Sequence, residues 1–142
     1  MPEVEPPERC APLGTEPVPG SGGLEIAHRP ALGGLPLSGS GTASGAVWMR
    51  LADDRPVDAL TAVVLADAAV PALFLALDEF TPMPTVEMVV HFADLAVAEH
   101  SPWLLGHIEN VHASDGWAIE DGELWTPRGE LVLTARQLRH LT

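Results

Sequence analysis

The stretch from Ala59 to Leu77 is the feature that most constrains how this chain can fold. It consists mostly of Ala and Leu, and its nineteen residues include one charged side chain, Asp67, and one helix-breaking residue, Pro71. This composition favours a helix, and a helix that is apolar on every side must be surrounded by other parts of the chain. We therefore expect the rest of the sequence to supply strands that enclose a central helix.

The predicted helix has an irregularity at its centre. It is expected to begin near Pro56, because proline suits the first helical turn, and to end near Phe80, where the sequence continues Thr-Pro-Met-Pro. A helical Pro71 would lack the N–H group that normally donates to the carbonyl of Asp67. The sequence therefore predicts a bend on the turn that carries the Asp67 carboxylate.

Six segments have the alternation of polar and apolar residues that is typical of strands. They are residues 24–29 and 46–51 before the helix, and 85–92, 103–112, 117–125 and 130–140 after it. Tight turns join the last three segments, which predicts an antiparallel meander. Asp121 and Gly122 are interpreted as a bulge, because a hairpin there would leave halves too short to pair with their neighbours. One helix and one antiparallel sheet predict an α+β domain whose sheet curls around the helix.

The N-terminal twenty residues differ in composition from the rest of the chain. They contain six prolines and four glutamates, which is typical of an extended, poorly ordered tail or linker. We therefore divide the chain into a tail at residues 1–21 and a single domain at residues 22–142. Cys10 is expected to be exposed in the tail, without a partner for a disulfide or for catalysis.

Charge and cysteine content exclude several function classes. The 142 residues carry a net charge of −13, from 20 acidic residues against 7 basic ones. A chain this acidic has no basic stripe to meet phosphates, so neither a nucleic acid nor an anionic membrane is an expected partner. Asp67 and Pro71 argue against a membrane span. With a single cysteine and no visible signal peptide, a cytoplasmic protein is expected.

Four blocks of sequence resemble a known family. The blocks, in order, are VWMRLADDRPVDALTAVVLADAAVPALF, PTVEMVVHF, WLLG and DGWAIEDGELWTPRGELVLTARQ. Together they resemble the C-terminal half of the TesB-like (type II) acyl-CoA thioesterases, from about Leu24 to the end of the chain. The resemblance implies a hotdog fold, in which a curved antiparallel sheet wraps a long central helix. It also implies hydrolysis of fatty acyl-CoA thioesters to free acid and CoA.

The same resemblance implies a set of catalytic residues. In that family an Asp of the central helix, a Ser or Thr at the start of the next strand and a Gln of the last strand hold the attacking water. These positions correspond to Asp67, Thr85 and Gln137. A carboxylate that accepts a water proton, beside a hydroxyl and an amide that fix the water, is general-base chemistry without a covalent nucleophile. No cofactor is expected, and the six histidines show no metal-ligand spacing.

Each of these residues also has an ordinary structural explanation. Asp67 can cap the helix bend or face a subunit interface, and Gln137 can be an edge residue that faces water. By strict alternation Thr85 shares a strand face with Glu87 and His91. As the first residue of its strand, Thr85 can still point into a cleft.

The resemblance finally implies partners. The family normally joins two hotdog halves in one chain, so we expect this chain to form a homodimer or to pair with another hotdog domain. Two candidates to bind the phosphates of acyl-CoA, Arg136 and Arg139, flank Gln137. Further candidates are Arg29, Arg50 and Arg55. The alternative function is a non-catalytic hotdog subunit for assembly or acyl binding; a hydratase is less favoured, because the helix carries no paired Asp and His.

Overall fold

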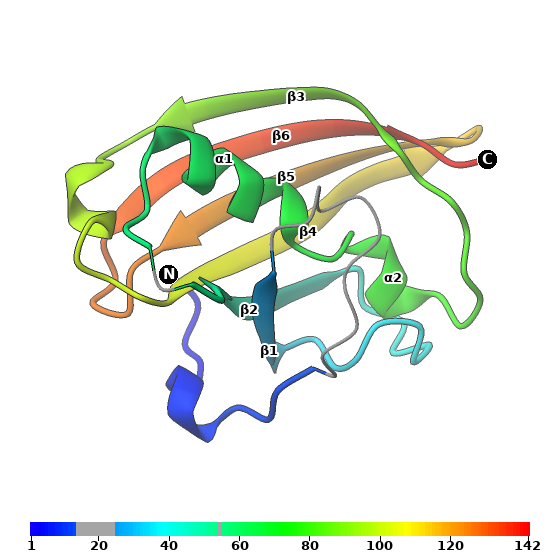
Figure 1. The fold of residues 1–142 in the computed structure, drawn as a ribbon. Coiled ribbons are helices and arrows are strands. Elements are labelled where there is room, and N and C mark those ends of the chain that lie inside the picture. The colour runs from blue at the N-terminus through cyan, green and yellow to red at the C-terminus, as the bar shows by residue number, and fades with distance from the viewer. Residues whose placement is uncertain (14–24, 54) are drawn as a thin grey trace.

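The six strands that the structure describes belong to one antiparallel sheet (Figure 1). The computed structural model describes residues 1–13, 25–53 and 55–142. The strand order across the sheet is β1-β2-β4-β5-β6-β3. The strands span Ile26–Leu32 (β1), Ser44–Leu51 (β2), Thr85–Phe92 (β3), Leu104–Ser114 (β4), Trp117–Trp125 (β5) and Leu131–His140 (β6). All six lie where the alternation in the sequence predicted them, and β4, β5 and β6 form the predicted meander.

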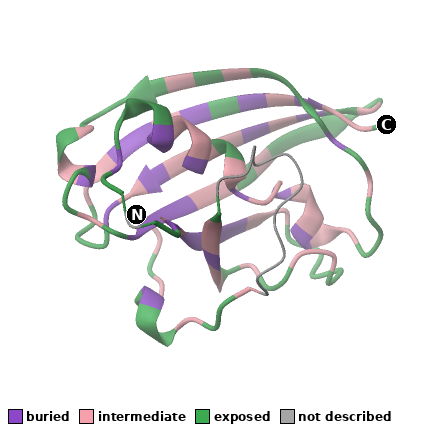
Figure 2. Cartoon of the chain, in the orientation of Figure 1, coloured by how far each residue is buried: buried purple, intermediate pink, exposed green. Residues whose placement is uncertain are grey.

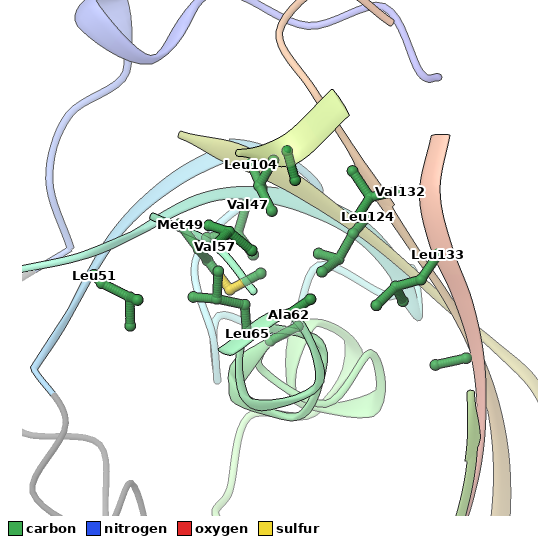
Figure 3. Packing of buried hydrophobic residues seen from close by; sticks show 13 residues of the cluster. Val47, Met49, Leu51, Val57, Ala62, Leu65, Leu104, Leu124, Val132 and Leu133 are labelled. Atoms are coloured by element: carbon green, nitrogen blue, oxygen red, sulfur yellow. The ribbon is translucent and has the colours of Figure 1, made fainter. Parts of the chain in front are cut away.

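The sheet curves around a helical segment made of α1 (Ala59–Ala68) and α2 (Leu73–Ala76) (Figure 1). The core lies between α1 and the concave face of the sheet, where Ala62 and Leu65 are fully buried. Figure 3 shows these side chains among residues of the sheet, including Val47, Met49, Leu104, Leu124 and Leu133. Each fully buried Leu or Met contributes about 1.5–3 kcal/mol to stability. This packing confirms the α+β arrangement that the sequence predicted.

The outer side of α1 is not enclosed. Leu60 is 78% exposed, although the apolar composition predicted a helix surrounded on every side. By length and composition the segment Ala59–Ala76 could cross a membrane, and 39% of it is buried within the structure. The sheet thus covers one face of the helix and leaves the other face uncovered.

The helix begins at a capping box. The carboxylate of Asp58 accepts from the backbone N–H of Thr61 at 2.8 Å, and the Thr61 hydroxyl oxygen accepts from the Asp58 N–H at 2.8 Å. These two bonds satisfy donors that the first helical turn cannot satisfy internally. The helix therefore starts at Ala59, three residues after the predicted start at Pro56.

The predicted bend at Pro71 is a complete break. Helix α1 ends at Ala68, and Ala69 leaves the helical region with ψ of 132°. The second helix is a single turn that ends at Ala76. Because the residue before a proline is also kept out of the helical region, Pro71 interrupts the helix over several residues rather than tilting it.

The predicted bulge at Asp121 and Gly122 was wrong. Both residues pair in regular register with β4 and with β6. A Cβ at Gly122 would lie 3.9 Å from the Ala135 side chain of β6, which is an ordinary contact, so close packing does not explain the glycine either. The irregularities among the described strands lie elsewhere, at Ala31 in β1, Val86 in β3, Val111 in β4 and Val132 in β6.

Residues 4–13 pack on the opposite face of the sheet from α1 (Figure 1). The indole N–H of Trp48 donates to the carbonyl of Glu5 at 2.9 Å, and Arg29 donates to the carbonyl of Pro7 at 2.7 Å. Cys10 is partly buried against the same apolar cluster rather than exposed. Residues 14–21 of the predicted tail lie outside the described residues, so the domain boundary near residue 21 stays a prediction.

Candidate active site

Three elements bring Asp67, Thr85 and Gln137 together. They come from α1, β3 and β6 respectively, and the hydroxyl of Thr85 lies between the other two side chains. Its oxygen is 2.8 Å from Oε1 of Gln137 and 3.5 Å from Oδ1 of Asp67. Asp67 and Thr85 are exposed, whereas Gln137 is only 6% exposed. The cluster is therefore open to solvent on one side and anchored in the domain on the other.

A bulge at Val86 turns Thr85 toward this cluster. In the pairing of β3 with β6, Glu87 lies opposite Leu138 and Thr85 lies opposite Arg139, which leaves Val86 as the extra residue. Directly opposed residues share a face of a sheet, so Thr85 points to the face that α1 covers. The expectation that Thr85 shares a face with Glu87 was wrong, because one inserted residue reverses the alternation.

The break after α1 places Asp67 at the end of a helix. Asp67 is the penultimate residue of α1, and the next carbonyl, that of Ala68, lies 3.2 Å from Nε2 of His28. The imidazole of His28 is only 6% exposed and gives this carbonyl a partner in place of the missing helical N–H. His28 of β1 therefore supports the helix end that carries Asp67, a role that the sequence analysis did not identify.

A buried ion pair lies directly behind Thr85. Nε of Arg139 donates to Oε2 of Glu120, and Nη1 of Arg139 donates to the Thr85 hydroxyl oxygen at 2.9 Å. The side chains of Arg139 and Glu120 are 7% and 5% exposed. The second carboxylate oxygen of Glu120 accepts from the backbone N–H of Ala72 at 2.6 Å, just before α2.

Glu120 was absent from the predicted site, although its sequence position contained a signal. Within β5 the inward positions alternate as Ala118, Glu120, Gly122 and Leu124, and Ala118 and Leu124 are fully buried. A carboxylate in such a row must find a hydrogen-bonding or charged partner. The sequence could have raised that question, but it could not have identified Arg139 as the partner.

The two arginines that flank Gln137 have different surroundings. Arg136 is exposed and donates two bonds of 2.6 Å to the carboxylate of Asp121, which hold the pKa of Asp121 below its ordinary value. Adjacent strand residues point to opposite faces, so Arg136 lies on the face away from Asp67. Arg139 points inward and is buried. Binding of CoA phosphates by Arg136 stays a prediction, and the contacts of Arg139 are with Glu120 and Thr85.

The arrangement can hold and deprotonate a water molecule. The exposed carboxylate of Asp67 can accept a proton, and the amide N–H2 group of Gln137 can donate, because its oxygen already contacts Thr85. Among the residues that the structure describes, no group of three or more His, Cys, Asp or Glu side chains is placed to hold a metal ion. The chemistry that fits is general-base activation of water.

Comparison with protein families gives one match that covers most of the chain. The family model for the acyl-CoA thioesterase C-terminal domain matches residues 7–139. This span includes every residue of the cluster described above, from His28 to Arg139. It also includes residues 7–21, which the composition assigned to a tail. No curated protein matches the chain.

Solved structures share the fold over the full length of the chain. A hot dog fold protein of unknown function from Alicyclobacillus acidocaldarius is 27% identical, with a TM-score of 0.86 and 100% of this chain covered. The acyl-CoA thioesterase II TesB2 of Mycobacterium marinum is 22% identical, with a TM-score of 0.68 and 100% coverage. The tesB protein of Mycobacterium avium subspecies paratuberculosis is 18% identical, with a TM-score of 0.69 and 100% coverage.

This chain is about half as long as these relatives. The alignments cover 54% of the Alicyclobacillus chain, 55% of the M. marinum chain and 54% of the M. avium chain. The shared part is a six-stranded antiparallel sheet around a central helix, which confirms the hotdog fold. The activity and the partners of the longer proteins do not follow from this likeness alone.

Proposed function

Because this chain belongs to the acyl-CoA thioesterase C-terminal domain family, we propose that it hydrolyses an acyl-CoA thioester to a free acid and CoA. The observation that carries this proposal is the meeting of Asp67, Thr85 and Gln137 around one hydroxyl group. These three residues come from three separate elements and are the ones that the family resemblance implies. Their open side is where a thioester could reach them.

In the proposed reaction Asp67 acts as the general base. A water held by Asp67 and by the amide N–H2 group of Gln137 loses a proton to the carboxylate while its oxygen attacks the thioester carbonyl carbon. The carbon–sulfur bond of the resulting tetrahedral intermediate then breaks. The CoA thiolate leaves and takes up a proton, and the acyl group is released as a carboxylic acid. Thr85 fixes the side chain of Gln137 through its hydroxyl, which lies 2.8 Å from Oε1.

The test is thiol release from a panel of acyl-CoAs of different chain length, with the Asp67→Asn variant alongside. Asn keeps the size of the side chain and removes the base, so we expect kcat to fall by about 10²–10⁴-fold. Because Asp67 is exposed, the variant should fold as the parent does. Turnover that is absent from the parent, or that Asp67→Asn leaves unchanged, would contradict the proposal.

We further propose that the domain pairs with a second copy or with another hotdog domain. Strand β3 is an edge of the sheet, and Figure 2 shows it as largely exposed. Three of its apolar side chains, Val86, Val89 and Phe92, are 58%, 43% and 47% exposed, and Leu60 of α1 is 78% exposed. An unpaired edge beside an uncovered apolar helix face is the kind of surface that a partner buries.

The same exposed surface supports a second candidate function. A hotdog domain without activity could serve as an assembly or acyl-binding subunit of a larger complex, and its exposed edge would then be its functional surface. The thiol-release assay separates the two functions. A chain that binds acyl-CoA without turnover, whether or not Asp67 is present, supports the subunit function.

A further inference from the structure

We propose that Arg139, held in place by Glu120, is a positioning residue that sets the direction of the Thr85 hydroxyl. This inference rests on the proposed function and concerns residues to which the family resemblance gave no such role. Arg139 contacts Thr85 at 2.9 Å and has no contact with Asp67 or Gln137 among the described hydrogen bonds. It therefore acts through Thr85 rather than on the substrate.

The guanidinium group of Arg139 is suited to this task because it is a rigid fork. One arm, Nε, donates to Glu120, and another, Nη1, donates to Thr85. A lysine ammonium at this position would be a single point donor on a flexible stem. The planar fork fixes the donor relative to the Glu120 carboxylate. The pairing of β5, which carries Glu120, with β6, which carries Arg139, fixes the two side chains relative to one another.

The donor decides where the only proton of the Thr85 hydroxyl goes. A hydroxyl has one proton to donate and two lone pairs to accept. Arg139 donates to the oxygen and so occupies a lone pair, which leaves the proton to point at one of the remaining acceptors. Oε1 of Gln137 at 2.8 Å is much nearer than Oδ1 of Asp67 at 3.5 Å.

Two consequences follow for the proposed reaction. The Asp67 carboxylate is left free to accept the proton of a water molecule. The amide of Gln137 is held with its oxygen toward Thr85 and its N–H2 group away from it. A hydroxyl that rotated freely would donate to Asp67 for part of the time and would weaken it as a base.

Glu120 connects this arrangement to the helix break. One of its carboxylate oxygens holds Arg139, and the other accepts from the backbone N–H of Ala72 at 2.6 Å. Ala72 follows the break that ends α1, and Asp67 is on the last turn before it. One buried carboxylate therefore fixes both the donor to Thr85 and the segment that follows Asp67.

The experiment must separate this role from the role of a buried ion pair in stability. Removal of one partner would leave an unpaired charge in the core and would destabilise the fold strongly. The double variant Glu120→Gln/Arg139→Met avoids this, because it removes both charges together. Its Gln side chain retains an oxygen to accept from Ala72, so the bonds that are lost are the ion pair itself and the donation to Thr85.

Kinetics in two backgrounds provide the first readout. In the parent background we expect Glu120→Gln/Arg139→Met to lower kcat by about 10–100-fold and to leave KM nearly unchanged. In a Thr85→Val background, where no hydroxyl remains to be directed, the same pair of changes should have no further effect on kcat. Equal losses of kcat in both backgrounds would show that Arg139 does not act through Thr85 and would overturn the proposal.

Matched variants separate positioning from charge and stability. Arg139→Lys keeps the charge beside Glu120 without the fork, so it should lose kcat as the double variant does; if it retains full activity, the proposal fails. It also provides the test if the double variant does not fold. Arg128→Lys is the control, because Arg128 is 75% exposed on the β5–β6 turn and contacts Glu130 rather than the cluster.

A second readout does not depend on turnover. Three-bond NMR couplings between the Thr85 hydroxyl proton and its Hβ report whether the hydroxyl group holds one rotamer about the Cβ–Oγ bond. We expect one rotamer in the parent and averaging in Glu120→Gln/Arg139→Met. A Thr85 hydroxyl group that stays in one rotamer in that variant would overturn the inference, even if the parent hydrolyses acyl-CoA. If the parent has no activity but the rotamer averages as expected, the proposed function fails and the positioning role stands.

Discussion

At the scale of single residues, Gln137 differs from the other members of the proposed site because it is buried. Asp67 and Thr85 reach the cluster from exposed positions, while Gln137 continues the inward row of Leu133 and Ala135 along β6. A buried amide must be hydrogen-bonded to be tolerated, and the Thr85 hydroxyl meets that need at 2.8 Å. The pair is thus part of the core as well as of the site.

Replacement of Gln137 should separate these two roles. We expect Gln137→Ala to lower kcat for acyl-CoA hydrolysis by about 10²-fold or more, because the attacking water loses its amide donor. Gln137→Glu keeps the shape but presents a carboxylate near Asp67, and it should be at least as impaired. Steady-state kinetics with circular dichroism as a fold control measure this. Full activity in folded Gln137→Ala would exclude Gln137 from the mechanism.

At the scale of elements, two irregularities shape the site. The break between α1 and α2 exposes backbone groups that side chains of the sheet then satisfy, His28 at the Ala68 carbonyl and Glu120 at the Ala72 N–H. The bulge at Val86 turns the first residue of β3 inward. Both features depart from regular structure, and both lie next to residues of the cluster: the break follows the helical turn that carries Asp67, and the bulge follows Thr85.

Deletion of Val86 tests the pairing that gives Thr85 its direction. Val86 is the extra residue of β3, so with one residue fewer Glu87 still lies opposite Leu138 and Thr85 still lies opposite Arg139, now in unbroken alternation. Thr85 should therefore keep its inward direction, and we expect kcat to stay within about 10-fold of that of the parent. Val86→Ala keeps the residue count and is the matched control, and its kcat should also stay close to that of the parent. A folded deletion variant that loses activity would show that pairing with Arg139 does not by itself direct Thr85.

The capping box of α1 predicts a pH dependence of stability. The backbone N–H and hydroxyl of Thr61 donate to the Asp58 carboxylate and lower its pKa from the ordinary value of 3.8. A lowered folded-state pKa stabilises the fold above the unfolded-state value, and this contribution is lost as the pH falls through the folded-state pKa. We expect Asp58→Ala to lower the melting temperature by about 3 °C at pH 7, and by less below pH 3.8.

Thermal melts of the parent and of Asp58→Ala between pH 7 and pH 3 measure this difference. Asp58→Asn is the control, because a neutral Asn caps a helix nearly as well as Asp and does not titrate. A difference between the parent and Asp58→Ala that is constant over the whole pH range would contradict the capping contribution of the charged form.

At the scale of the whole molecule, the sheet has a different cover on each face. The concave face holds α1, and the opposite face holds residues 4–13 over a cluster that includes Trp48 and Trp103. The guanidinium groups of Arg29 and Arg50 lie 5.1 Å and 5.0 Å from the Trp103 ring centroid. What stays open is the β3 edge and the outer side of α1, where Leu60 lies.

This open surface predicts self-association. We expect light scattering at micromolar concentration to give about twice the monomer mass of 15.0 kDa. Leu60→Glu should return the protein to the monomer mass, because a charge would be buried in the paired surface. In contrast, Asp115→Asn, on the β4–β5 turn, should leave the assembly unchanged. A parent that is monomeric at this concentration would exclude the homodimer and leave pairing with a separate hotdog domain.

The sequence alone determined the elements and the identity of the proposed site residues. The alternation of polar and apolar residues in a strand is a local property of a few consecutive residues, so all six strands were located from it. The apolar composition of residues 59–77 identified the central helix in the same way. Asp67, Thr85 and Gln137 could be identified because family blocks in the correct order carry them.

Only the tertiary structure decided how those residues point and what supports them. A bulge is a mismatch between two strands, so the inward direction of Thr85 depends on its pairing with β6 and cannot be read from β3 alone. Likewise, Glu120, Arg139 and His28 acquire their roles from partners 19 to 54 positions away along the chain. Contacts between distant elements have no local signature, and these contacts hold the site together.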